Sequence, residues 1–203
     1  MFEVLTGAGL AAAAGLNAYI PLLVLGLLSR FTDLVSLPAG WSWLENGWVQ
    51  IILGVLLIIE IVADKIPAVD SVNDWIQTIV RPAAGGIVFG SGTVAQTATV
   101  TDPASFFTSF AWVPIVLGIL LALTVHVGKT VVRPAANVAT AGIAAPVLST
   151  IEDFFSAVMS FVALLLPVLV ILGLAGLVIG AVALIRRMRH RRLDAPPVPR
   201  PGT

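Results

Sequence analysis

The sequence contains no cysteine, and only 11% of its 203 residues are charged. The lack of cysteine excludes disulfide bonds, thiol catalysis and cysteine-ligated metal sites. Soluble domains carry about 25% charged residues, so the low charge content argues against an ordinary soluble domain. Hydrophobic residues make up 58% of the chain, and the mean hydropathy is +1.03. This composition is typical of an integral membrane protein, whose helices satisfy their own backbone hydrogen bonds in lipid.

Common catalytic motifs are missing as well. The sequence has neither an HExxH zinc motif nor a GxSxG serine motif. The glycine-rich stretch 85–92 (GGIVFGSG) follows Arg-Pro and lacks the lysine of a phosphate-binding loop. We therefore expect no enzyme activity, no cofactor, no bound metal and no nucleic-acid partner. Metal-dependent lipid chemistry at Asp70 and Asp74 is a minority hypothesis, which retained activity in an Asp70→Ala/Asp74→Ala variant would remove.

Apolar segments predict a polytopic, all-α transmembrane bundle with six spans. A bilayer needs about 20 apolar residues per helix. The expected spans are Leu5–Leu28, Trp48–Ala63, Ala83–Val100, Phe110–Val127, Ala135–Leu148 and a last one within Phe155–Ile185. The third and fifth are the weakest, and without them four spans remain. We expect a single transmembrane domain over residues 1–187 and a disordered, basic and proline-rich tail over 188–203.

Two further features refine this topology. Apolar residues recur at helical spacing over 69–79, which predicts a short interfacial helix that ends before Pro82. If all six segments cross and the N-terminus is inside, every basic residue except Arg30 is cytoplasmic, as the positive-inside rule requires. The four-span version keeps the tail inside but moves Lys129 and Arg133 outside. We therefore expect six spans with both termini in the cytoplasm.

One phrase of the sequence occurs twice. Residues 51–65 (IILGVLLIIEIVADK) resemble 115–129 (IVLGILLALTVHVGK), and 78–84 (TIVRPAA) resemble 130–136 (TVVRPAA). The copies extend over about 48–84 and 112–136, and the first carries extra residues between its lysine and its Arg-Pro. This pattern predicts an internal duplication of a helical hairpin, with a site or an ion-pair seam where the two hairpins meet.

Charged residues gather in these two copies. Charges at membrane depth are costly, so they are usually paired or functional. The candidate ligand- or ion-binding residues are Glu60, Asp64, Lys65, Asp70, Asp74, Arg81, His126, Lys129 and Arg133. The secondary candidates are Asn17, Asn137, Glu152 and Asp153, of which the last two fall in a predicted outer turn apart from the cluster.

Three interpretations of the cluster stay open. It is an ion-pair seam that ties the hairpins together, an anion site for a lipid phosphate held by Lys and Arg, or a proton or cation path through Glu60, Asp64 and His126. The first suits a non-catalytic scaffold or assembly subunit. The other two suit a small transporter or a lipid- or anion-binding membrane protein, which is our leading hypothesis. Expected partners are membrane lipids, including an anionic lipid or small anion, and further copies of the chain or other membrane proteins.

Several short motifs also resemble a known family. They are GLNAYIPLL at 15–23, ExxxDKIPxVD at 60–70, RPAAG at 81–85, HxxK at 126–129 and SxxED at 149–153. Together they resemble a bacterial integral-membrane family known as a domain of unknown function (number four-one-two-six). The resemblance covers nearly the whole chain except the tail. It implies a multi-pass protein of the bacterial inner membrane, and it supplies no activity or site.

Overall fold

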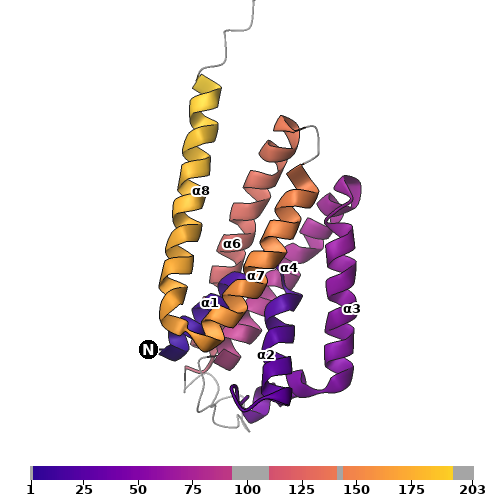
Figure 1. Cartoon of the computed structure of the whole chain (residues 1–203), viewed down its shortest axis with the longest axis vertical. Helices are drawn as coiled ribbons and strands as arrows, with labels where there is room; N and C mark the ends of the chain where they lie inside the picture. Colours follow the sequence, from indigo (N-terminus) through magenta and orange to yellow (C-terminus); the bar gives the residue numbers. More distant parts are fainter. Residues whose placement is uncertain (1, 93–109, 141–143, 194–203) are drawn as a thin grey trace, which may run out of the picture.

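The structure is a computed structural model that describes residues 2–92, 110–140 and 144–193. Every regular element in these residues is a helix (Figure 1), so the all-α prediction is confirmed. The α-helices are α1 (Phe2–Leu16), α2 (Tyr19–Phe31), α3 (Gly47–Ala63), α4 (Pro67–Gly92), α6 (Trp112–Ala139), α7 (Ala144–Leu165) and α8 (Val170–Leu193). Two short 3-10 helices are η1 (Ala39–Glu45) and η2 (Pro167–Leu169).

Fewer helices than predicted are long and apolar enough to cross a membrane. Two described helices meet both criteria, over Trp112–Val131 in α6 and Ala145–Leu165 in α7. A third span results if α3 is counted together with η1, from which it is bent by 63°. The described residues therefore support a membrane protein with two or three such spans by length and composition, in place of the six expected.

The expected first span, Leu5–Leu28, is broken into two half-length helices at Asn17 and Ala18. α1 has 15 residues and α2 has 13. At 1.5 Å per residue they are roughly 23 and 20 Å long, which is shorter than the hydrocarbon core of about 30 Å. Neither helix spans a bilayer alone.

α1 and α2 form a re-entrant hairpin, because both of their outer ends lie at the same end of the bundle (Figure 1). Near its start, Gly7 of α1 is in close contact with Gly92 at the end of α4. Near the end of α2, the backbone carbonyl of Gly26 accepts a hydrogen bond of 3.0 Å from Gln50 at the start of α3. α1 thus enters the bundle and α2 returns. We call Leu16–Ala18, where the chain reverses, the hairpin tip.

The predicted interfacial helix and the weak third span are wrong in their boundaries. α4 runs without interruption from Pro67 to Gly92, through Pro82. A proline lacks the N–H of the helical ladder, yet the helix continues because its second half packs closely on α6. A Cβ at Gly85 would lie 2.7 Å from the carbonyl oxygen of Gly118, and small residues of this kind allow helices to approach in membranes. The part of the expected span beyond Gly92 lies outside the described residues.

The predicted duplication of a hairpin does not appear as two hairpins. The first copy folds as α3 and α4, separated by a turn at Asp64–Ile66, whereas the second lies within the single helix α6. The reason is the extra sequence after Lys65, which the second copy lacks. Only three residues separate Lys129 from Arg133, and the helix continues through Pro134.

The C-terminal predictions also change. The expected fifth span, Ala135–Leu148, is divided between the end of α6 and the start of α7, with residues 141–143 outside the described part. The next helix, α7, ends at Leu165, and Pro167 separates it from α8 where a single span was expected. α8 continues into the expected tail as far as Leu193. The start of α1 and the end of α8 lie at opposite ends of the bundle (Figure 1), which does not fit two termini on one side.

The bundle is built around α1, which packs against α4, α6 and α7. Four consecutive alanines, 11–14, are fully buried there and let the neighbouring helices approach.

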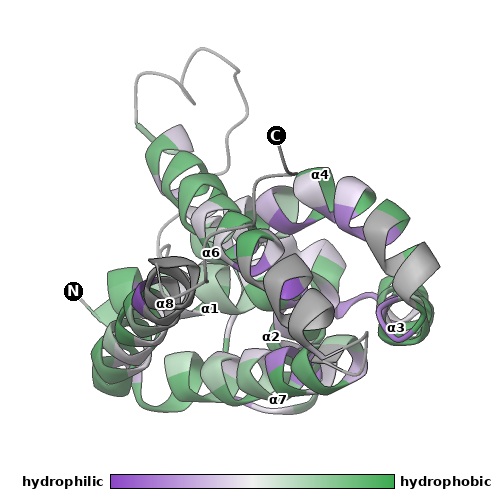
Figure 2. Cartoon of the chain, turned by 90° about the horizontal axis from the view of Figure 1, so that it is seen from above, coloured by the Kyte–Doolittle hydropathy of each residue, from purple (hydrophilic) through white to green (hydrophobic). Residues whose placement is uncertain are grey.

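On α3 the distribution of buried and exposed side chains is the reverse of that in a soluble protein. Only Glu60 and Ala63 of α3 are buried, whereas Ile51, Ile58 and other large apolar side chains are more than half exposed. Seen from above, α3 and α7 are coloured mainly as hydrophobic (Figure 2), and many of their large apolar side chains are exposed, as expected for a lipid-facing surface.

Candidate functional site

Charged side chains from four segments meet in the interior of the bundle. We call Glu60, Asp64, Arg81, Lys129, Arg133 and Glu152 the charge cluster. Glu60 lies near the end of α3, and Asp64 follows that helix directly. Arg81 lies on α4, Lys129 and Arg133 on α6, and Glu152 on α7. Five of these side chains are at most 2% exposed, and Glu152 is 14% exposed. Charges this deeply buried are retained only when they are paired.

Arg81 joins α4 to α3 and to the hairpin. Its Nη2 lies 2.7 Å from Oε1 of Glu60 and 3.9 Å from Oδ2 of Asp64. Its Nη1 donates a hydrogen bond of 3.3 Å to the backbone carbonyl of Gly15. Gly15 belongs to the last turn of α1, where the helix dipole favours a cation. Arg81 therefore holds the C-terminal end of α1 as well as two acids.

Lys129 and Arg133 lie four residues apart on α6 and so share one face of the helix. Nη2 of Arg133 is 3.0 Å from Oδ2 of Asp64 and 2.6 Å from Oε2 of Glu152. Nζ of Lys129 is 3.0 Å from the same Glu152 oxygen and 3.8 Å from Oδ2 of Asp64. Each of these two bases thus contacts both acids.

Asp64 is the centre of the cluster, with three bases within 4 Å of its Oδ2. Its Oδ1 accepts a hydrogen bond of 2.7 Å from the side chain of Asn73. Asp64 follows α3, outside the apolar span. Burial by itself would raise the pKa of its carboxyl, but Lys129, Arg133 and Arg81, together with Asn73, hold that pKa below its ordinary value. Asp64 is therefore stabilised as a carboxylate.

Three polar groups border the cluster. Oδ1 of Asp74 is 4.0 Å from Nη1 of Arg133. His126 is buried, and its Nε2 lies 3.1 Å from the hydroxyl oxygen of Thr78. That hydroxyl donates its own proton to the backbone carbonyl of Asp74 at 2.8 Å. Because the hydroxyl has one proton, its oxygen accepts from Nε2 of His126, which therefore carries hydrogen.

The hairpin tip lies against the same region. Asn17 is fully buried, and its Oδ1 accepts hydrogen bonds from the backbone N–H groups of Tyr19 and Ile20, at 3.0 and 3.1 Å. It thereby satisfies two of the first N–H groups of α2. Its Nδ2 donates to Oδ1 of Asp153 in α7 at 2.9 Å. One side chain thus caps α2 and links the tip to α7.

The structure brings together most of the residues that the sequence singled out. Glu60, Asp64, Arg81, Lys129 and Arg133 form the cluster, and Asp74, His126 and Asn17 border it. Lys65 stands apart, because its side chain is exposed and its Nζ donates to the carbonyl of Ile61 near the end of α3. The side chains of Asp70 and Asn137 lie outside the described part of the structure.

The separate placement of Glu152 and Asp153 was wrong. Both lie inside α7, where Glu152 pairs with Lys129 and Arg133. The sequence contained a pattern that predicts this: Ser149, Ser156 and Ser160 recur at helical spacing around them, and all three are fully buried. The contact of Arg81 with Gly15 had no such pattern, because it uses a backbone carbonyl. Among the described residues, no group of three or more His, Asp or Glu side chains could hold a metal ion.

The comparison with known families gives a single result. The sequence profile described as "Domain of unknown function (DUF4126)" matches residues 4–187. This chain belongs to the DUF4126 family. No curated protein and no solved structure matches it. The resemblance seen in the short motifs is thus confirmed, and the DUF4126 segment includes the hairpin tip and every member of the charge cluster.

Proposed function

We propose that this DUF4126 protein is a small secondary transporter of the bacterial cytoplasmic membrane, coupled to protons at the charge cluster. The observation that carries the proposal is the re-entrant hairpin, whose tip ends beside the charge cluster, five of whose six side chains are buried. Non-helical backbone at membrane depth is tolerated only where protein buries it or where it lines an aqueous path. Transporters commonly place half-helix ends and buried ionisable groups at such a break.

The charge count favours a proton or another cation over an anion. Among the described residues, the cluster together with Asp74 and Asp153 holds five acids, Glu60, Asp64, Asp74, Glu152 and Asp153, against the three bases Arg81, Lys129 and Arg133, with the exposed Lys65 left out of the count. Counted in their ordinary ionisation states, these groups carry a formal net charge of −2. All three bases already contact acids, so an anion would have to displace a carboxylate. The excess acids offer places for protons.

Glu60 is the best candidate for proton exchange. Its Oε1 pairs with Arg81, whereas its buried Oε2 has no hydrogen-bond partner in the described residues. A buried carboxylate oxygen without a partner is costly, and a proton on it reduces that cost. His126, which lies on α6, is a second group of the type used in proton relays. Because the end of α8 is basic and lies at the cluster end of the bundle (Figure 1), we place that end in the cytoplasm.

Cysteine accessibility tests the proposal directly, since the native chain has no cysteine. Ala18, at the hairpin tip, is 0% exposed. An Ala18→Cys variant in oriented membrane vesicles is treated with a membrane-impermeant maleimide from either side. A transporter must open its site to each side in turn, so we expect labelling from both. Matched controls are Gly40→Cys in η1, which is exposed at the other end of the bundle, and Val55→Cys on the lipid-facing side of α3.

The controls define the outcomes. Gly40→Cys should label from one side only, and Val55→Cys from neither. If Ala18→Cys stays unlabelled, or labels from one side only, the tip does not alternate between the two solutions and the transporter proposal fails. If Ala18→Cys is labelled from both sides, a second measurement follows in proteoliposomes. Glu60→Gln should slow the proton movement that accompanies transport, whereas exposed Lys65→Gln should leave it unchanged.

A second function, a membrane scaffold or assembly subunit, is favoured by one observation. The ion pairs tie α3, α4, α6 and α7 to one another, and each base has an acidic partner. On this proposal the cluster only holds the fold. Ala18→Cys would be inaccessible from both sides, and charge substitutions would lower thermal stability without changing any flux.

A third alternative is that the bases of the charge cluster bind an anionic lipid. Native mass spectrometry of wild type beside Arg81→Ala/Arg133→Ala checks it. A phospholipid bound to wild type and lost from the variant would support an anion site. A lipid-free mass for both proteins would argue against one.

A further inference from the structure

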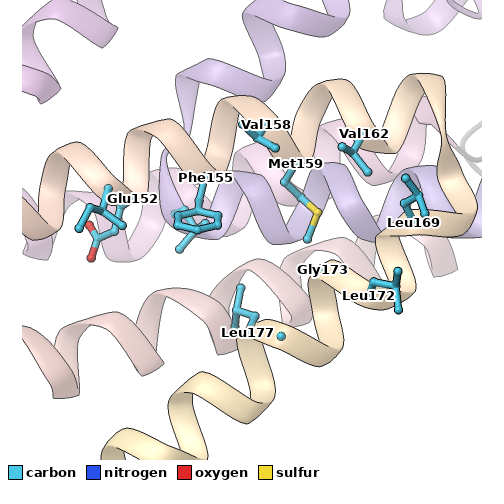
Figure 3. Close-up of a pocket in the computed structure, with 12 residues that line it drawn as sticks. Glu152, Phe155, Val158, Met159, Val162, Leu169, Leu172, Gly173 and Leu177 are labelled. Atoms are coloured by element: carbon cyan, nitrogen blue, oxygen red, sulfur yellow. The ribbon is translucent and has the colours of Figure 1, made fainter.

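An apolar groove of about 690 Å³ runs between α7 and α8 (Figure 3). Phe155, Met159 and Val162 form its α7 side, and Leu172 and Gly176 belong to its α8 side. Leu16, the first residue of the hairpin tip, also lines it. The groove therefore extends from the surface between two helices to the point where the re-entrant hairpin reverses. Its volume falls within the range of about 300–1,000 Å³ found for small-molecule sites.

One end of the groove is charged. Among the described residues that line the groove, Glu152 alone has a polar side chain, and it lies at one end of the row of α7 side chains in Figure 3. Its carboxylate is 14% exposed, and Lys129 and Arg133 contact it from within the cluster. An anionic head entering the groove would meet this carboxylate first. A cationic head would meet an acceptor and would offset the formal net charge of −2 carried by the cluster together with Asp74 and Asp153.

We propose that the groove binds a single-chain amphiphile with a primary ammonium head, its chain along α7 and α8 and its nitrogen at Glu152. This deepens the proposed function by naming a substrate class, and it rests on that function only for the link to transport. Binding itself is a separate claim. Because a proton and an ammonium would offset the same excess negative charge, the two would compete for the cluster.

The glycines of α8 make a clean test possible. A Cβ added at Gly176, which lines the groove, would meet no atom within 4 Å. Gly176→Leu should therefore fill the groove without a clash. Gly180, one turn further along α8, is equally unobstructed and lies outside the lining, so Gly180→Leu is the matched control. Replacing glycine in a helix interior raises helix propensity by up to about 1 kcal/mol, so both variants should fold.

The experiment uses the full chain in phosphatidylcholine nanodiscs with photoactivatable probes that carry a diazirine in a 16-carbon chain. One probe is hexadecylamine, and the matched probe is the corresponding carboxylic acid. After irradiation, the labelled peptides are mapped and quantified by mass spectrometry. We expect the amine to label 151–177 of wild type at least tenfold more than the acid does. Gly176→Leu should lose at least 90% of this labelling, and Gly180→Leu should keep it.

Each other result overturns the inference. Equal labelling of wild type and Gly176→Leu would show that the amine does not occupy the groove. Equal or stronger labelling by the acid would show that Glu152 does not select the head. Glu152→Gln, checked for a wild-type melting profile, should abolish the preference for the amine while the chain still labels α7 and α8. If wild type is labelled no more by the amine than by the acid, this inference is refuted and the transporter proposal is untouched. If the Ala18→Cys test fails, transport is refuted and the binding result still holds.

Discussion

Asn17 and Asp153 are joined by a hydrogen bond of 2.9 Å although they lie 136 positions apart in the chain. The bond fastens the hairpin tip to α7, and the same asparagine caps α2. A short re-entrant helix depends on such contacts, because it has neither the length nor the lipid anchors of a full span. The position of the tip beside the cluster is therefore set by few groups, which makes it sensitive to single substitutions.

Asn17→Ala should lower the free energy of unfolding by about 1–3 kcal/mol, because it removes a helix cap and leaves Asp153 without this partner. Asn46→Ala is the matched control, since Asn46 caps α3 in the same way through the N–H of Trp48 but far from the cluster. The control should lose only a cap energy of about 1 kcal/mol. Thermal unfolding in detergent measures both. Equal losses would contradict a special role for the tip.

The Arg81–Glu60 pair predicts strong coupling between two substitutions. Arg81→Leu leaves the buried Glu60 without its ion-pair partner, and Glu60→Leu leaves Arg81 with the longer 3.9 Å contact to Asp64. Each should cost about 3–5 kcal/mol. The double variant removes both charges and should recover at least half of that loss. A double-mutant cycle from unfolding measurements gives the coupling energy. Strictly additive losses would mean that the 2.7 Å contact carries no stability.

Gly15 allows α1 to approach α6. A Cβ there would lie 2.6 Å from both the backbone oxygen of Ala122 and the Cβ of Val125, so Gly15→Ala must displace one helix. We expect a loss of about 1–3 kcal/mol from overpacking. Gly128→Ala on α6, where an added Cβ meets nothing within 4 Å, should be neutral or slightly stabilising. The melting temperatures of the two variants test this prediction. Similar shifts for both would contradict a close approach of α1 to α6 at Gly15.

Asp64 should make the protein sensitive to acid. The pKa of its carboxyl is lower in the folded protein than the ordinary value of 3.8, so the unfolded chain takes up the proton more readily. Its stabilisation is complete above that value and is lost as the pH falls through the lower folded pKa. Asp64→Asn should be less stable at neutral pH and lose less on acidification, while exposed Asp33→Asn keeps the wild-type profile. Parallel profiles for wild type and Asp64→Asn would contradict this.

The sequence predicted which charges matter better than it predicted where the helices end. The repeated Lys and Arg-Pro marked four bases, of which Arg81, Lys129 and Arg133 lie in the cluster and Lys65 does not. Charges in an apolar context are costly enough to require partners, so their grouping follows from composition. The sequence did not predict that Glu152 belongs to the cluster, because its segment was interpreted as an outer turn.

Span boundaries depend on packing that hydropathy does not contain. Leu5–Leu28 is predominantly apolar, yet the chain reverses at Asn17 because that side chain accepts from the first N–H groups of α2 and binds Asp153. Conversely, Pro82 and Pro134 do not end their helices. Whether a polar residue or a proline interrupts a helix is decided by partners on other helices.

Lys129 and Arg133 are held at a fixed spacing because both belong to the single helix α6. Their acidic partners Asp64 and Glu152 belong to different parts of the chain, and each of the two acids contacts both bases. The contacts are therefore duplicated: the loss of either base leaves both acids with a basic partner on the same helix.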